Sequence, residues 1–446
     1  MNILDTWNKL KINDIVYKNI DNLTAVYLKR CYKDCYIIEG VGCDIFNALI
    51  NKVNYSDLIC SLKKEYNVEN VDIENDIAEF IEELINENIL YINEKFTEEI
   101  KSASLVGNEN ITLVCDYYMK NKKPYKVFLE TTYACNLNCD HCYLQGATNS
   151  DINCIEIDRI KEIINELSEL GLVELVITGG EAGLYKHLVE LIKYASSKNI
   201  LVTLLSNGTI FDDNMIDKII DAGIHDLRVS LYGFEDYHDK FVHRSGSFSN
   251  SVKTLSSFRK KAGIGSASCI ITKENVDQLN DLKKYLMQMG IPISYSPLII
   301  PTIYGDKSPT KLRLDYPALK NLIEEHNINI GGNKCTAGIS RFRIMPNGNV
   351  NPCEMLRHIT LGNIYESSFT EILNSREEQL WINTYSESES TKCKNCVYSK
   401  YCINCKGLSY LENGVLNSYT KFSCDIAEIQ HNLYSPKKME VISSND

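Results

Sequence analysis

The sequence predicts an α/β protein whose central part is built on a parallel sheet. Between residues 127 and 298, six segments with the apolar character of buried strands alternate with segments whose apolar residues recur at helical spacing. Such βα units in series imply parallel strands joined by right-handed crossovers, in either an open Rossmann-type sheet or a partial barrel.

Each strand and helix of this region has a local signal. Ile157, Ile160, Ile164 and Leu167 form one helical stripe. Four helices end just before a glycine, which readily adopts the left-handed conformation found after helices: Gly171, Gly223, Gly263 and Gly290. The expected strands are VFLETTY (127–133), VELVITG (173–179), LVTLLSN (201–207), DLRVSLYG (226–233), SASCIIT (266–272) and PISYSPL (292–298).

The first 98 residues indicate a separate module with a winged-helix-like order of elements. Three short strands come first, the last two joined as a hairpin around Tyr32 and Lys33, and three helices follow. The expected strands are 14–20, 24–31 and 34–40, and the expected helices are 43–53, 56–67 and 73–91. The chain is thus divided into the module 1–98, a linker 99–124, the strand–helix region 125–310, a bridging helix 311–334, a cysteine-rich region 335–431 and a tail 432–446.

Composition excludes several classes of partner. A net charge of −12 argues against nucleic acid, because that binding depends on neutralising phosphates. No run approaches the roughly 20 apolar residues that span a bilayer, and no secretory signal is visible, so we expect a cytoplasmic protein without a membrane partner. In a reducing compartment, the 17 cysteines favour metal ligation over disulfides.

Three cysteines follow the first expected strand at C-x-x-x-C-x-x-C spacing: Cys135, Cys139 and Cys142. Only about 0.02 such triplets are expected by chance, and the carboxyl ends of parallel strands are where α/β folds bind ligands. A structural zinc site is one interpretation, but His141 as fourth ligand would sit beside Cys142 and strain a tetrahedron. On a four-iron cluster, three thiolates would leave one iron able to bind a small chelating molecule.

This loop resembles the signature of the radical S-adenosylmethionine enzymes. The resemblance covers about residues 125–300 and implies a partial (β/α)₆ barrel, a 4Fe–4S cluster and S-adenosyl-L-methionine, which is cleaved to a 5′-deoxyadenosyl radical. It also implies that His141 and Leu298 lie near the adenine, that Gly179, Gly180 and Glu181 lie near the methionine part, and that Ser206 and Asn207 lie near the ribose. Ser230 would contact the cofactor, and Arg244 would hold its carboxylate. An ordinary Asn-Gly turn at Ser206–Asn207 and a core role for Leu298 are the alternatives. Ala182 stands where relatives usually have proline.

Seven more cysteines lie in the C-terminal region, five of them between residues 393 and 424, where about 1.2 are expected by chance. Their order resembles the SPASM extension of peptide-modifying radical enzymes, which carries two auxiliary iron–sulfur clusters; a pair of zinc knuckles is the alternative. The resemblance implies three 4Fe–4S clusters in all, with Cys393, Cys396, Cys402 and Cys424 at one auxiliary site and Cys335, Cys353 and Cys405 at the other. The spacing between Cys402 and Cys405 is one residue shorter than usual, which leaves this partition open.

A site with three cysteines could leave an iron open to a substrate thiolate, a geometry suited to carbon–sulfur bond formation. Cys269 is the nearest upstream cysteine, but it lies within an expected strand and we assign it to the core. Glu354, directly after Cys353, stands where sulfatase-maturing relatives have an acidic base; an ordinary surface carboxylate is the other interpretation.

The N-terminal module resembles the leader-recognition domain of peptide maturases, where an extended leader adds to a sheet edge, here residues 24–40, beside the helix from Ile73. The sequence therefore predicts a maturase that forms sactipeptide- or ranthipeptide-type thioethers in a ribosomally made precursor peptide. It would draw electrons from an external low-potential donor. Carbon–carbon cross-linking, sulfatase maturation and, more remotely, a zinc-binding scaffold are the alternatives.

Overall fold

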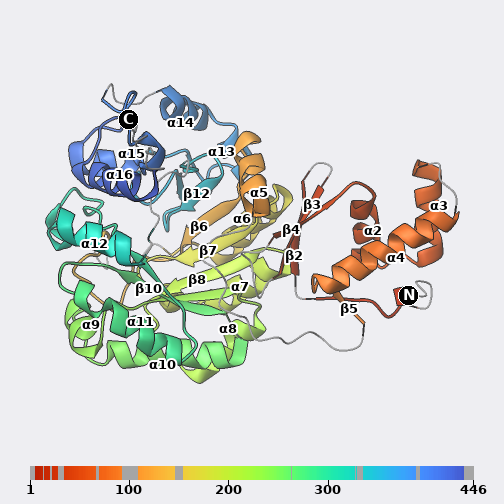
Figure 1. The fold of residues 1–446 in the computed structure, drawn as a ribbon, viewed down its shortest axis with the longest axis horizontal. Coiled ribbons are helices and arrows are strands. Elements are labelled where there is room, and N and C mark those ends of the chain that lie inside the picture. The colour runs from red at the N-terminus through yellow and green to blue at the C-terminus, as the bar shows by residue number, and fades with distance from the viewer. Residues whose placement is uncertain are drawn as a thin grey trace, which may run out of the picture.

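The computed structural model describes residues 6–13, 15–20, 23–28, 35–66, 70–92, 109–145, 154–262, 264–326, 328, 335–387 and 392–435. The N-terminal module lies at one side of the central sheet, and the C-terminal region lies beside the opposite part of that sheet (Figure 1). Within the described residues, no helix is long and apolar enough to cross a membrane.

The central sheet has the strand order β11-β10-β9-β8-β7-β6-β12-β13-β14. The six expected strands are all present and pair in parallel, each with its successor in the chain. A sheet without a reversal of strand order is the arrangement of a barrel, not of a Rossmann fold, so the partial barrel is confirmed. The strands are β6 (Lys126–Glu130), β7 (Glu174–Thr178), β8 (Leu201–Ser206), β9 (Asp226–Ser230), β10 (Gly265–Ile270) and β11 (Ile293–Ser296).

Helices cover the outer face of these strands (Figure 1). In α6 the buried stripe is Ile160, Ile163, Ile164 and Leu167, while the predicted Ile157 is only partly buried. Gly171, Gly223 and Gly290 have φ of 89°, 88° and 69°, as the glycine signals predicted; Gly263 lies outside the described residues. The helices are α6 (Ile157–Glu169), α7 (Leu188–Ser197), α8 (Asp213–Asp221), α9 (Glu235–Phe241), α10 (Ser247–Ala262), α11 (Leu279–Gln288) and, in the expected bridging segment, α12 (Tyr316–His326).

The N-terminal module has the expected three strands followed by three helices. The sheet order is β2-β3-β4, and both pairs are antiparallel; the hairpin tip at Tyr32 and Lys33 lies outside the described residues. The last helix ends earlier than predicted, because the chain turns at Asn88 (φ 57°) and forms β5, which pairs with β1. The elements are β1 (Lys11–Ile12), β2 (Ile15–Ile20), β3 (Leu23–Leu28), β4 (Cys35–Glu39), α2 (Val41–Ile50), α3 (Tyr55–Tyr66), α4 (Asn70–Asn86) and β5 (Leu90–Tyr91).

The expected linker contains a helix, α5 (Glu109–Lys120), that joins the module to the barrel. Its buried Val114 and Tyr118 pack with Val16 of β2 and Leu201 of β8, and the Tyr118 hydroxyl donates to the Gly171 carbonyl at 2.5 Å. The polar composition of this stretch belongs to the outer face of an amphipathic helix, which is why it was interpreted as a linker.

The C-terminal region extends the barrel sheet. Strand β12 (Arg341–Ile344) pairs in parallel with β6, and β13 (Asn349–Asn351) and β14 (Gly362–Asn363) follow in antiparallel order. These strands were not predicted. Four helices complete the region: α13 (Phe369–Leu373), α14 (Arg376–Glu387), α15 (Lys406–Asn413) and α16 (Lys421–Tyr434). The expected tail therefore begins inside α16, and residues 436–446 lie outside the described residues.

The outer edge of β2 is fastened to the barrel by Asn199, which follows α7. The Asn199 side chain donates to the Tyr17 carbonyl at 2.8 Å, and the Lys18 ammonium donates to the Asn199 carbonyl at 2.6 Å. Lys18 is only 6% exposed, and burial lowers its pKa to about 7.

The buried Lys18 should make stability depend on pH. Between about pH 7 and 10 the unfolded chain binds a proton that the folded chain releases, so the free energy of unfolding should rise with pH. The difference between wild type and Lys18→Met should grow by up to about 1.4 kcal/mol from pH 7 to pH 8, measured by anaerobic urea unfolding. Lys64→Met, on the exposed face of α3, is the control. Equal pH slopes for wild type and Lys18→Met would contradict the prediction.

Candidate functional site

The first cysteine loop lies at the carboxyl end of β6 and is held by the chain after α9. Asn138 N donates to the Val242 carbonyl at 3.2 Å, and Asp140 N donates to the Phe241 carbonyl at 3.1 Å. Burial raises the pKa of Cys139, and the proximity of Cys142 and Cys135 raises it further. The structure therefore gathers the three predicted thiols at one place. Among the described residues, no three His, Cys, Asp or Glu side chains are grouped as ligands of a single metal ion.

Gly179 and Gly180 allow two loops to meet at the strand ends. Gly180 N donates to the Thr132 carbonyl and Glu181 N to the Ala134 carbonyl, both at 2.8 Å. A Cβ on Gly179 would overlap the Thr132 carbonyl oxygen, and one on Gly180 would overlap that of Ala134. The sequence interpretation was that these glycines admit a ligand; in the structure they admit the segment that leads into Cys135.

Glu181 is a buried carboxylate at this meeting point, 1% exposed. It accepts from Ser206 Oγ at 2.7 Å, Asn207 N at 2.7 Å and Gly183 N at 2.8 Å. Burial raises its pKa, and these hydrogen bonds offset only part of the effect; no cation is among the groups that act on it. A carboxylate buried without a cation suits a ligand that brings its own positive charge, such as the ammonium or sulfonium of S-adenosylmethionine.

An amide network joins the cysteine loop to the end of β8. Asn207 Nδ2 donates to Asn136 Oδ1, and Asn136 Nδ2 donates to Thr209 Oγ1, both at 2.8 Å. Arg244 reaches the same loop, since its Nη1 donates to the Asn136 carbonyl at 3.2 Å. Asn136 and Thr209 were not predicted as site residues, although both lie inside the motifs that were.

His141 lies in a buried aromatic cluster behind the cysteines. Its ring stacks on Phe241 with centroids 5.1 Å apart and meets Tyr232 edge-on at 4.8 Å. Burial lowers the pKa of His141 to about 4, so the ring is neutral. Ser230 lies beside Tyr232, which it contacts through a side-chain hydrogen bond, and Leu298 packs partly buried against the barrel core. The aromatic partners Phe241 and Tyr232 were missed from the sequence.

The C-terminal cysteines divide into two neighbourhoods. Cys424 has Cys402, Cys393 and Cys396 as its charged neighbours, and these four thiols line a cavity of about 100 Å³. Cys405 also lines that cavity, but the neighbours that act on its pKa are Cys335 and Glu354, and Cys405 in turn acts on Cys353. Cys269 is fully buried in β10, as expected for a core residue.

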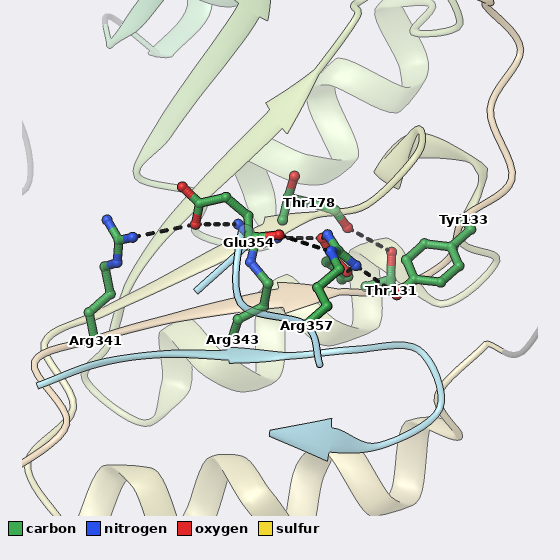
Figure 2. A network of polar contacts seen from close by, with 8 residues as sticks. Thr131, Tyr133, Thr178, Arg341, Arg343, Glu354 and Arg357 are labelled. Atoms are coloured by element: carbon green, nitrogen blue, oxygen red, sulfur yellow. Dashed lines mark hydrogen bonds and ion pairs between the residues drawn. The ribbon is translucent and has the colours of Figure 1, made fainter. Parts of the chain in front are cut away.

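A buried network of charged side chains lies between the first loop and the Cys353 turn (Figure 2). Glu130, at the end of β6 and 0% exposed, accepts from Arg343 and from Arg357 Nη2 at 2.5 Å and Nη1 at 2.8 Å. Arg357 Nη1 also contacts the Tyr133 hydroxyl at 2.8 Å, two residues before Cys135. Burial alone would raise the pKa of Glu130, but the two guanidinium groups outweigh burial and lower it. None of these residues was predicted.

Glu354 belongs to the same network. Its Oε2 lies 3.4 Å from Arg341 Nη2 and 3.4 Å from Arg343 Nη2 (Figure 2). Burial would raise its pKa, but Arg341 and Arg343 lower it to about 2. The two guanidinium groups therefore favour the ionised form of Glu354, and its catalytic role stays a prediction.

Comparison with known proteins agrees with this geometry. Residues 129–286 match the Radical SAM superfamily, and residues 335–397 match an iron-sulfur cluster-binding domain, SPASM. The chain contains a radical SAM domain and a SPASM domain.

Relatives of this radical SAM protein differ in their named activities. An AdoMet-dependent heme synthase of Methanosarcina barkeri is 26% identical over 65% of this chain and 93% of its own length. The antilisterial bacteriocin subtilosin biosynthesis protein AlbA of Bacillus subtilis is 26% identical over 64% of this chain and 68% of its own. The crystal structure of Streptococcus suis SuiB bound to precursor peptide SuiA has a TM-score of 0.62 at 15% identity, over 93% of this chain and 99% of that one.

Removing the charge of Glu130 should destabilise the protein strongly. Glu130→Gln leaves Arg343 and Arg357 buried without their shared counter-ion, so we expect a loss of about 3–5 kcal/mol in anaerobic urea unfolding. Glu324→Gln breaks a surface pair with Lys320 at 3.7 Å and should cost at most about 0.5 kcal/mol. A Glu130→Gln variant as stable as Glu324→Gln would show that the network does not hold the two regions together.

Proposed function

We propose that this chain is a radical S-adenosylmethionine enzyme that forms thioether cross-links, from cysteine sulfur to carbon, in a ribosomally made precursor peptide. Three cluster sites, one S-adenosylmethionine site and one peptide site are needed for this function. The residues described above supply candidates for each.

The cysteine thiolates and the Glu181 carboxylate are suitable ligands for the iron–sulfur clusters and the S-adenosylmethionine that the family implies. Cys135, Cys139 and Cys142 would hold the cluster of the barrel, and the Glu181 carboxylate would accept from the ammonium of S-adenosylmethionine. When bound, this pair supplies one-electron chemistry that yields a carbon radical. Cys393, Cys396, Cys402 and Cys424 would hold one auxiliary cluster, and Cys335, Cys353 and Cys405 the other.

The other predicted cofactor-binding residues would orient S-adenosylmethionine. Ser206 and Asn207 fix the Glu181 carboxylate, and Gly179 and Gly180 bring that turn against the cysteine loop. Arg244 is exposed beside this loop and can receive a carboxylate bidentately. His141, Ser230 and Leu298 would border the nucleoside.

A groove on the N-terminal module is the observation that most supports a peptide substrate. Its volume is about 620 Å³, and it lies along β4, with walls from α2, α4 and Leu113 of α5. β4 is the last strand of its sheet, so its outer edge is where an extended peptide could add as a strand. Ile37, Val41 and Phe80 provide apolar surface for its side chains.

The heme synthase relative suggests a second activity. It is matched over 93% of its own length by only 65% of this chain, so about a third of this chain has no counterpart there. AlbA and SuiB are named for bacteriocin biosynthesis and for a precursor peptide, and SuiB covers the module as well as the barrel. We therefore favour a peptide substrate over a porphyrin.

The groove can be tested with one pair of exposed leucines. Leu113→Glu places a charge on the groove wall, so the affinity for the labelled leader segment of a short cysteine-rich precursor peptide, to be sought in the neighbouring reading frames, should fall at least about tenfold. Leu380→Glu is the matched control, because Leu380 is 53% exposed on α14 and Leu113 is 52% exposed. Fluorescence anisotropy would measure both; equal affinities would contradict leader binding in this groove.

The chemistry can be tested by product analysis with the co-expressed precursor. The peptide should lose two hydrogens per cross-link together with one alkylatable thiol, measured by mass spectrometry before and after alkylation. Cys139→Ala should abolish 5′-deoxyadenosine, whereas Cys405→Ala should retain some cleavage without cross-linked peptide. Thiols retained beside the same mass loss would favour carbon–carbon linkage, and an unmodified peptide would favour the heme-synthase type of activity.

A further inference from the structure

The loop region around the distal cysteines is basic in an otherwise acidic chain. Residues 392–424 contain five lysines and a single acidic residue, Glu412, whereas the whole chain has a net charge of −12. Glu412 does not neutralise these lysines from nearby, because its carboxylate accepts from Arg313 Nη2 at 2.6 Å. The lysines are Lys392, Lys394, Lys400, Lys406 and Lys421.

Three of these lysines remain as an exposed basic patch, which we define as Lys392, Lys394 and Lys400. Lys421 is paired with Asp425 at 2.7 Å, and Lys406 is partly buried. Neither Lys394 nor Lys400 forms an ion pair with a carboxylate of the described residues. The Lys392 ammonium lies 4.0 Å from the centroid of the Tyr419 ring.

Exposed apolar side chains and an accessible thiol accompany the basic patch, since Val397 lies between Lys394 and Lys400 in the chain and Lys392 lies near Tyr419 and Cys424. Val397 is 72% exposed and Tyr419 is 43% exposed. Tyr419 lines the same cavity as the four distal cysteines, and Cys424 is itself exposed. A small apolar centre with a rim of one charge is typical of transient protein interfaces, where charge steers the encounter and little area is buried.

We propose that the basic patch is the docking surface for a small acidic one-electron carrier protein. The inference rests on the proposed function, which requires electrons from outside the chain. In each encounter the reduced carrier would lose one electron to the enzyme and leave oxidised. Charge complementarity selects an acidic carrier, and Lys392 of the patch lies near the exposed thiol of Cys424. A solvated lysine cluster without a partner is the plain alternative.

The test compares two triple charge reversals in the loaded enzyme. Lys392→Glu, Lys394→Glu and Lys400→Glu together remove the basic patch. Lys253→Glu, Lys260→Glu and Lys283→Glu make the same change on exposed positions of α10 and α11. Binding of a purified, negatively charged flavodoxin, measured by calorimetric titration at low salt, should weaken at least about tenfold in the first variant and less than about twofold in the second. Added salt should weaken wild-type binding as well.

Reduction by dithionite provides the internal control. Because dithionite needs no docking surface, dithionite-driven 5′-deoxyadenosine formation should be unchanged in both variants, whereas flavodoxin-driven formation should fall only in the first. Lys→Gln at the same three positions should give an intermediate loss of flavodoxin binding, which would distinguish an effect of charge from an effect of misfolding. An unchanged iron content would confirm that the cluster sites are intact.

Three results would overturn the docking surface. They are flavodoxin affinity equal to wild type in the first variant, an equal loss in the second variant, and lysine-dependent binding of a short DNA duplex without binding of flavodoxin. A wild-type enzyme that binds flavodoxin through these lysines yet forms no 5′-deoxyadenosine with dithionite would instead refute the proposed function and leave the docking surface standing.

Discussion

The ion pairs between Glu130 and the two arginines Arg343 and Arg357 constrain the whole site. A charge without solvent contact is tolerated only when its partners are in place, so β6 and the chain around Cys353 must keep one relative position. Arg357 continues the connection to Tyr133, at the entrance to the first cysteine loop, and Arg343 continues it to Glu354, beside Cys353. The parallel pairing of β12 with β6 adds backbone hydrogen bonds to the same junction. The two cysteine regions are thus parts of one framework, although about 200 residues separate them in the chain.

At the mouth of the barrel, a second and smaller set of contacts joins neighbouring loops. Two glycines let neighbouring loops touch through their backbones, and amides on Asn136 and Asn207 close the contact from the other side. Glu181 differs from Glu130 and Glu174 because its hydrogen-bond partners are all neutral donors. Glu130 and Glu174, by comparison, are each bound by basic side chains. The Glu181 carboxyl group therefore lies near Cys135 without a basic partner, whereas Glu130 and Glu174 belong to structural ion pairs.

The parts of the fold that sequence reasoning found are those with local signals. Alternating apolar periods located all six barrel strands, and cysteine spacing located the thiols that the structure gathers. The helix α5 was interpreted as a linker because its apolar stripe is short and its partners, Val16 and Leu201, are distant in the chain. The charged network was missed for a similar reason: Glu130 and Arg357 are unremarkable one at a time, and only the pairing of β12 with β6 brings them together. For Glu354 the sequence suggested a proton acceptor from its position beside Cys353, but it could not reveal the neighbouring arginines Arg341 and Arg343, which lower the pKa of Glu354.

The fastening of β2 to Asn199 has a consequence for substrate choice. The N-terminal sheet has one edge occupied by the barrel and the other edge at β4, so a chain held along β4 is anchored at a fixed separation from the barrel interior. For a peptide gripped there, the number of residues between the anchored part and the reacting part determines which residues arrive at the radical site. The choice of the residue that reacts would then depend on the length of this spacer more than on the side chains that flank each cysteine.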